Sequence, residues 1–169
     1  MRIEGGRDTG PKGGDMSVRI RRMVPEDYDA AYALWEQTVG MRLTALNNTY
    51  GGIAKLIAQN PQTCLVATTD GLVSGDEVRS SDGSRIVGTA LGAVDGRKGY
   101  LYHVAVDERW RGQGLGSSLI SRVCDVFKAD GIITISLLTT ADNVGGQQFW
   151  ESQGWRRRPD VVYFTRDLE

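Results

Sequence analysis

The amino-acid sequence predicts a single domain of the α/β (α+β) class. Runs of apolar, β-branched and aromatic residues with the length of strands recur along the chain. Between them lie segments in which apolar residues return at helical spacing. The clearest example is the run 100–106, which a short polar turn and a glycine-rich loop join to the helical pattern of 115–130. A chain of 169 residues is long enough to bury one sizeable core.

Individual residues set the limits of the predicted elements. Pro25 suits the first position of a helix, and Pro61 ends the helix before it. Gly131 stops the helix that begins near residue 115. The run 100–106 is apolar on both faces, which indicates a central strand. In chain order, we predict a strand at 18–23, helices at 25–38 and 53–59, strands at 64–69, 86–94 and 100–106, a helix at 115–130, a strand at 132–138, a helix at 143–153, and a closing antiparallel pair at 155–158 and 161–166.

Two stretches fall outside these elements. Residues 1–15 are glycine-rich, polar and without periodicity, so we expect a disordered tail ahead of a domain at 16–169. Residues 70–85 carry Gly, Ser and Asp throughout and are long for a connection between paired strands. We expect a mobile loop there.

The composition is that of an ordinary soluble protein, with 40% hydrophobic residues, 24% charged residues and a net charge of -1. This charge argues against a nucleic-acid partner, which usually requires a strongly basic surface. No apolar run approaches the ~20 residues that span a membrane, and no signal peptide is visible, so we expect a cytoplasmic protein. Cys64 and Cys124 read as reduced core residues without metal-ligand spacing, and with a single histidine we expect no metal site.

The glycine-rich loop 111–116, Arg-Gly-Gln-Gly-Leu-Gly, is the first candidate for a binding site. Glycines at every second position leave a row of backbone N–H groups at a helix N-terminus, where an anion such as a phosphate is favoured. Arg111 and Ser117 add donors. A glycine-rich turn without a ligand is the simpler alternative. A dinucleotide fingerprint is a further one, but it requires G-x-G-x-x-G within repeated βαβ units, and neither feature is present.

Taken together, three motifs resemble the GNAT superfamily of N-acetyltransferases over residues 18–168. The first is the Arg/Gln-x-x-Gly-x-Gly/Ala loop, matched by Arg111, Gly114 and Gly116. The second is the strand end Val104-Ala105-Val106, and the third is a later helix pattern. That pattern is matched by Asn143, Gly146, Trp150, Gly154 and Trp155. The resemblance implies a central mixed, mostly antiparallel sheet of about six to seven strands flanked by about four helices.

The resemblance also implies acetyl-coenzyme A as the co-substrate. The amides of residues 112–117 would hold its pyrophosphate, and the backbone of 104–106 would pair with the pantetheine arm like an added strand. Asn143 would bind the arm from the other side, and an amide near 104–106 would stabilise charge on the thioester oxygen. The implied cofactor-binding residues are Val104, Ala105, Val106, Arg111, Gly112, Gln113, Gly114, Leu115, Gly116, Ser117, Asn143 and Trp150.

The acceptor amine must lose a proton, and two residues are candidates for catalysis. Many family members place a glutamate near the position of Tyr100, where this sequence has no acid. His103 is the one histidine of the chain, and an unperturbed pKa near 6.5 suits a base, with a pH–rate limb near 6 to 7. Strand alternation, however, predicts that His103 lies on the face opposite Tyr100 and Tyr102, and a hydrogen-bonded core histidine is the alternative.

The acid that protonates the departing thiolate stays open. Family members often carry a tyrosine where this chain has Trp150, whose indole only donates and is no acid at neutral pH. Water or another tyrosine such as Tyr163 could serve instead. Trp150 would then pack along the coenzyme arm or in the core.

The acceptor region of the family corresponds to the first helix and the segment after it. Candidate substrate-binding residues there are Trp35, Arg42, Asn47 and Tyr50. They fit a small polar molecule or a peptide terminus without choosing between the two. The leading hypothesis is direct acetyl transfer to a primary amine of a small molecule or peptide in a ternary complex, by a monomer or homodimer. The alternative is a non-catalytic acyl-coenzyme A binding or sensing module.

Overall fold

The structure, a computed structural model, describes residues 17–43, 48–70 and 77–168. The predicted tail at 1–15 lies outside these residues. The strands are β1 (Val18–Arg22), β2 (Cys64–Thr69), β3 (Arg85–Val94), β4 (Gly99–Val106) and β5 (Ile135–Leu137). The α-helices are α1 (Tyr28–Glu36), α2 (Tyr50–Gln59), α3 (Leu115–Ala129) and α4 (Val144–Ser152), and the 3-10 helices are η1 (Pro25–Asp27) and η2 (Glu108–Trp110).

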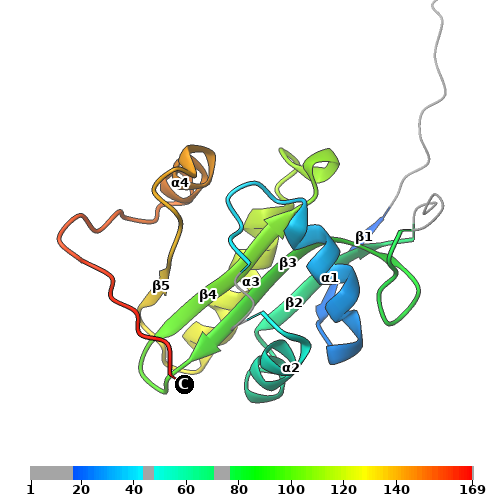
Figure 1. The fold of residues 1–169 in the computed structure, drawn as a ribbon, viewed down its shortest axis with the longest axis horizontal. Coiled ribbons are helices and arrows are strands. Elements are labelled where there is room, and N and C mark those ends of the chain that lie inside the picture. The colour runs from blue at the N-terminus through cyan, green and yellow to red at the C-terminus, as the bar shows by residue number, and fades with distance from the viewer. Residues whose placement is uncertain (1–16, 44–47, 71–76, 169) are drawn as a thin grey trace, which may run out of the picture.

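The five strands form one sheet in the order β1-β2-β3-β4-β5 (Figure 1). The first three pairings are antiparallel, and β4 pairs with β5 in parallel. The predicted α/β class and the mixed, mostly antiparallel sheet with four helices are therefore confirmed. The sheet of the described residues is smaller than the six to seven strands expected.

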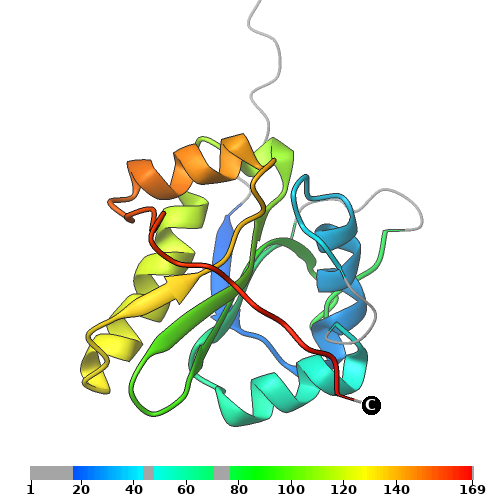
Figure 2. The same ribbon diagram turned by 60° about the vertical axis from the view of Figure 1, so that its left-hand side comes forward.

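The difference lies at the C-terminal end of the chain. The prediction of a closing strand pair at 155–158 and 161–166 is wrong, because both segments lie outside every strand. The apolar residues of 161–164 remain 59% to 86% exposed, so no buried face holds the segment against the sheet. Pro159 has no N–H for a ladder, and Arg158 pairs with Asp160 across it at 2.7 Å. The chain here is an extended segment with a local turn (Figure 2).

Helices cover both faces of the sheet and enclose two core clusters. α1 and α2 lie on one face around Trp35, which is fully buried, and α3 lies on the other face around Phe127 (Figures 1 and 2). The approach of α3 depends on a glycine, because a Cβ atom at Gly92 would lie 2.9 Å from Phe127 Cζ. Within the described residues, no helix is both long and apolar enough to cross a bilayer.

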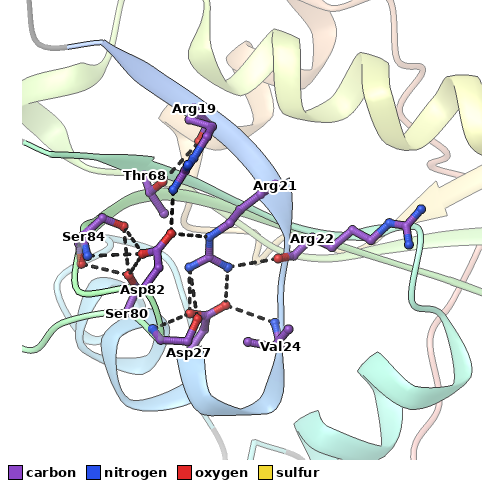
Figure 3. A network of polar contacts seen from close by, with 10 residues as sticks. Arg19, Arg21, Arg22, Val24, Asp27, Thr68, Ser80, Asp82 and Ser84 are labelled. Carbon is purple, nitrogen blue, oxygen red and sulfur yellow. Dashed lines mark hydrogen bonds and ion pairs between the residues drawn. The ribbon is translucent and has the colours of Figure 1, made fainter.

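An ion-pair network around the buried Asp27 connects β1 to the start of α1 and to the turn before β3 (Figure 3). The Arg21 guanidinium contacts both carboxylate oxygens of Asp27, at 2.7 and 2.9 Å, and its Nε contacts Asp82 at 3.1 Å. Asp82 in turn accepts from Ser80 Oγ at 2.7 Å. The described part of the predicted mobile loop, residues 77–84, thus contains a turn with specific hydrogen bonds, because its polar side chains bond to one another and to Arg21.

Candidate active site

The candidate site lies where β4 and β5 separate. Their pairing covers only Gly99–Leu101 of β4 and Ile135–Leu137 of β5. Beyond it, residues 102–106 have no strand partner among the described residues on the edge of β4 that faces away from β3. We call residues 102–106 the open edge. Such an edge presents unpaired N–H and C=O groups to an extended amide-containing ligand, and it includes the predicted segment 104–106.

The glycine loop leads from the open edge into α3. Gly112 and Gly114 have φ values of 73° and 78°, a left-handed conformation that glycine adopts without strain. No described residue accepts a hydrogen bond from the backbone N–H groups of residues 112–117. These amides point out at a helix N-terminus, where the helix dipole adds a partial positive charge. The arrangement suits an anion.

Side chains of the loop fasten it to its surroundings. Arg111 Nε donates to the carbonyl oxygen of Val106 at 3.0 Å, so this side chain connects the loop to the open edge. Gln113 Nε2 donates to the carbonyl oxygen of Arg109 at 3.2 Å. Gly116 lets α3 approach α4, because a Cβ atom there would lie 3.3 Å from Phe149 Cζ. Leu115 packs against the core on the α3 face, and Ser117 is half-buried.

Asn143 and Trp150 both have structural partners. Asn143 caps α4, since its Oδ1 accepts from Gly146 N at 3.0 Å and its Nδ2 donates to Thr139 Oγ1 at 3.3 Å. Its side-chain amide is therefore engaged within the protein. The Trp150 ring packs edge-on against Trp155 at a centroid distance of 5.1 Å and against the core on the α3 face. Of the two expectations for Trp150, packing along the coenzyme arm or in the core, the second agrees with these contacts, and the first stays a prediction.

A bulge at His103 interrupts β4 at the open edge. The ladder passes from the pair Leu91–Tyr102 to the pair Thr89–Ala105, so two residues of β4 face one residue of β3. His103 has a φ of 47°, a left-handed conformation that is uncommon outside glycine. A bulge inserts an extra residue and breaks the alternation of side chains on which the sequence argument rested.

The bulge therefore changes the face on which the histidine lies. Leu101 belongs to the core cluster under α3, which places the adjacent Tyr102 on the α1 face. The His103 ring also lies on the α1 face, 4.3 Å from the ring of Trp35. The prediction that His103 and Tyr102 lie on opposite faces is wrong. Both face the side of the sheet that α1 and α2 cover.

His103 is partly buried and weakly basic. Its Nε2 lies 2.7 Å from Asn48 Oδ1, an oxygen that only accepts, so the contact places the proton on Nε2. Nδ1 has no hydrogen-bond partner among the described residues. Burial lowers the pKa of His103 to about 4. The expected pH–rate limb near 6 to 7 is therefore not supported for this residue, which is neutral throughout that range.

Two tyrosines precede the bulge. Tyr100 lies in the paired part of β4, and its ring stacks on that of Tyr102 at a centroid distance of 6.3 Å. Tyr102 is the first residue of the open edge and is 42% exposed. Burial raises the pKa of Tyr102, and the phenols of Tyr100 and Tyr163 add to the rise. Its hydroxyl keeps its proton at neutral pH and remains accessible.

The predicted acceptor-binding residues separate into different environments. Trp35 is fully buried, so it supports the site from within the core and offers no surface to an acceptor. Arg42 pairs with Asp142, next to α4, at 3.1 Å. Tyr50 is 53% exposed at the start of α2. Asn47 lies outside the described residues.

Sequence reasoning missed two residues of this region. Asn48, the neighbour of the predicted Asn47, holds the His103 ring. Thr89 lies on β3 opposite the bulge and donates to the carbonyl oxygen of His103 at 2.6 Å. Thr89 is a polar residue within the apolar run of β3, which was the only sequence signal for it. Nothing in the local sequence indicated that it bonds to the His103 carbonyl.

Comparisons with known proteins show the family of this chain. The profile of the Acetyltransferase (GNAT) family matches residues 49–155. An acetyltransferase of Pectobacterium atrosepticum is 30% identical over 128 residues, which are 76% of this chain and 79% of that protein. The solved structure of the NatC complex bound to Gag peptide and CoA matches with a TM-score of 0.65 and 16% identity, over 85% of this chain and 87% of that chain.

A second solved structure also matches, that of an aminoglycoside acetyltransferase from an uncultured soil metagenomic sample in complex with sisomicin. Its TM-score is 0.62 and its identity 21%, over 90% of this chain and 97% of that chain. The matching profile and the relative define the class of enzyme, an acyltransferase. This chain belongs to the Acetyltransferase (GNAT) family.

Proposed function

We propose that the protein is an N-acetyltransferase that transfers an acetyl group from acetyl-coenzyme A to a primary amine. The observation that carries the proposal is the open edge of β4, residues 102–106, which begins beside β5 and is followed, through η2 and the glycine loop, by the uncapped N-terminus of α3. A ligand with a pyrophosphate at one end and an amide-containing arm at the other fits this arrangement, with the pyrophosphate at the helix N-terminus and the arm along the strand edge. Coenzyme A has that chemistry.

The donor would be held mainly by backbone. The free amides of residues 112–117 suit the pyrophosphate, and residues 104–106 suit the amides of the arm. The thioester would then lie near the bulge at His103. A backbone N–H beside it would stabilise the negative charge that develops on the thioester oxygen. Asn143 is a support of α4 in this arrangement, because its amide is already bonded.

The reaction forms an N–C bond and breaks a C–S bond. The ammonium of the acceptor first loses a proton, and the sulfur gains one on leaving. With a pKa of about 4, His103 is a poor base for an ammonium near 10.4, so we propose that the acceptor loses its proton to bulk solvent and enters the site as the neutral amine. Tyr102 is the better candidate to protonate the sulfur, because its phenol keeps its proton and is accessible at the open edge.

Direct transfer from donor to acceptor agrees with the state of the cysteines. Burial raises the pKa of Cys64 to about 12, so no thiolate forms there at neutral pH. Burial also raises the pKa of Cys124, and the charge of Asp125 adds to the rise. Neither thiol is activated to carry an acyl group. An acetylated enzyme intermediate is therefore not part of the proposal.

The acceptor is an amine of a small molecule or of a peptide. The relatives bound to sisomicin and to Gag peptide represent these two possibilities, and both stay open for this chain. The non-catalytic binding module suggested by the missing glutamate and tyrosine is not favoured, because the matched relatives are named acetyltransferases.

Two measurements test the proposal in sequence. Calorimetry with acetyl-coenzyme A should show binding at one site, and absence of binding would sink the donor assignment. Thiol release from acetyl-coenzyme A is then followed across amines, amino acids, polyamines, aminoglycosides and peptides. Acetylated product in at least one arm is expected. Binding of acetyl-coenzyme A without thiol release for any tested acceptor would instead favour the hypothesis of a non-catalytic binding module.

A further inference from the structure

A chain of buried hydrogen bonds lies directly beneath the bulge. Trp35 Nε1 is 2.9 Å from Thr89 Oγ1, and Thr89 Oγ1 is 2.6 Å from the carbonyl oxygen of His103. Trp35 and Thr89 are both fully buried. They come from different elements, α1 and β3, so the chain joins the helix layer, the sheet and the bulge.

The direction of these hydrogen bonds is fixed by their chemistry. An indole N–H only donates, so Thr89 Oγ1 accepts from Trp35. The single hydroxyl proton of Thr89 must then go to the His103 carbonyl, which only accepts. The Thr89 hydroxyl therefore both accepts and donates, and removing it leaves the Trp35 N–H without its acceptor and the His103 carbonyl without this donor.

The held carbonyl determines where the next N–H points. Here the side chain of Thr89 contacts the His103 oxygen where the ladder register shifts at the bulge. The described chain has no cis peptide bonds, so the Val104 N–H points away from the His103 carbonyl. Since the His103 carbonyl is directed at the Thr89 side chain, the Val104 N–H is directed away from Thr89.

We infer that Thr89 and Trp35 are positioning residues for acyl transfer. They hold the His103–Val104 peptide so that the Val104 N–H faces the place where the thioester oxygen becomes negative. This inference rests on the proposed function and adds to it the side chains that hold the Val104 N–H, the hydrogen-bond donor to the thioester oxygen, in place. A preorganised donor stabilises charge only if its direction is held before the reaction. The left-handed His103 needs such support, because its conformation is unfavourable in isolation.

The kinetic test compares three variants of the hydrogen-bond chain with one control variant. Thr89→Val keeps the shape but removes the hydroxyl, and Thr89→Ser restores it. We expect Thr89→Val to lower kcat about 10- to 100-fold, less than the ~100- to 1000-fold for a fully lost donor. KM for acetyl-coenzyme A should stay within about twofold, since the phosphate loop is unchanged. Thr89→Ser should recover most of kcat, and Trp35→Phe should cause a smaller loss than Thr89→Val.

Thr63→Val is the matched control. Thr63 is also a buried threonine whose hydroxyl donates to a backbone carbonyl of β3, that of Gly92, at 2.8 Å. Its removal should lower the melting temperature about as much as Thr89→Val while leaving kcat unchanged. Equal losses of kcat in Thr63→Val and Thr89→Val would show a general effect of stability and overturn the inference.

An NMR titration gives a result that needs no acceptor. In the ¹⁵N-labelled wild-type protein, acetyl-coenzyme A should shift the amide signals of Gly114 and Val104. In Thr89→Val, the Gly114 shift should persist while the Val104 shift is largely lost, and Thr89→Ser should behave like the wild type. Wild-type protein without a Gly114 shift would sink the proposed function, and the inference with it. An undiminished Val104 shift in Thr89→Val would overturn the inference alone.

Discussion

Two regions of this protein treat their polar groups in opposite ways. In the network at the start of α1, the buried carboxylate of Asp27 accepts from Arg21 twice and from the backbone N–H groups of Val24 and Ser81. At the candidate site, the amides of residues 112–117 have no acceptor among the described residues, and His103 Nδ1 has no partner there.

The difference separates scaffold from site. Buried polar groups are normally paired, because an unpaired group loses its hydrogen bonds to water and gains none in the protein. Where they are paired, a substitution should cost stability and leave binding intact. Where donors are left open at an accessible edge, a substitution should cost binding or turnover and leave stability nearly unchanged. The variants below test this division, from the largest expected effect to the smallest.

Asp27→Asn should give the largest effect, on stability alone. Burial tends to raise the pKa of Asp27, but the hydrogen bonds of Arg21, Val24 and Ser81 outweigh it and lower the pKa. Removing the charge leaves the Arg21 guanidinium without its main partner, which costs about 3–5 kcal/mol for a buried pair. Denaturant unfolding measures this loss, and calorimetry with acetyl-coenzyme A should give an unchanged Kd.

The control for Asp27→Asn is Asp160→Asn. Asp160 also pairs with an arginine, Arg158, but the two side chains are 62% and 66% exposed. An exposed pair contributes little to stability, so this variant should unfold almost like the wild type. Similar losses in the two variants would contradict the structural role assigned to the network.

Gly114→Asp should give the next largest effect, mainly on binding. The carboxylate would occupy the anion site and repel a pyrophosphate, so we expect Kd for acetyl-coenzyme A to rise about 100-fold, or roughly 2.7 kcal/mol. Nothing lies within 4 Å of the added Cβ, and aspartate tolerates a left-handed φ better than most residues. The left-handed φ of 78° strains any side chain and should lower stability modestly, and an acidic group at a helix N-terminus offsets part of this loss.

Gly96→Asp is the matched control for Gly114→Asp. Gly96 also has a left-handed φ, of 87°, and open space around its Cβ, but it lies in the turn between β3 and β4. Calorimetry should show wild-type affinity for Gly96→Asp. An unchanged Kd in Gly114→Asp would exclude the glycine loop as the phosphate site.

The sequence predicted those parts of the site whose signals are local. The glycine loop and the N-terminus of α3 are read from consecutive residues, and the structure has them at the expected positions. The bulge is a property of the pairing between β3 and β4, so strict alternation placed His103 on the wrong face. The pKa of His103 was likewise out of reach, because it depends on burial against Trp35 and Asn48.

The closing strands show the same limit. Residues 161–166 have the composition of a strand, yet they lie outside every strand and stay exposed in the described chain. β-propensity reflects fit to a half-buried pleated surface, and that surface is a matter of tertiary contacts. The local sequence pattern therefore predicted where apolar runs lie, but it did not predict whether each run pairs with a neighbouring strand.

His103→Asn tests the partly buried histidine through the pH dependence of stability. The folded pKa is about 4 and the unfolded pKa about 6.5, so between these values the unfolded chain binds more protons. Stability from this group is therefore complete above about pH 6.5 and is lost as the pH falls toward about 4. From about pH 7.5 to about pH 5 the wild type should lose roughly 2 kcal/mol through His103.

Asparagine tolerates the left-handed conformation and does not titrate, so His103→Asn should lack this part of the pH dependence. Urea unfolding of both proteins across the pH range measures the difference. If the free energies of unfolding of the two proteins change with pH in parallel, His103 titrates normally in the folded protein. His103 would then again be a candidate for the general base.

Asn143→Ala gives the smallest effect and decides between two roles for this residue. As the cap of α4 it should cost about 1 kcal/mol when removed, with Kd for acetyl-coenzyme A within about threefold of the wild type. Thr49→Ala is the matched control, because Thr49 Oγ1 accepts from Gly52 N at 3.2 Å as the cap of α2. Similar losses in stability would place Asn143 with the paired scaffold. A Kd raised more than tenfold, with stability intact, would instead make Asn143 a ligand of the coenzyme arm and move the boundary of the site onto α4.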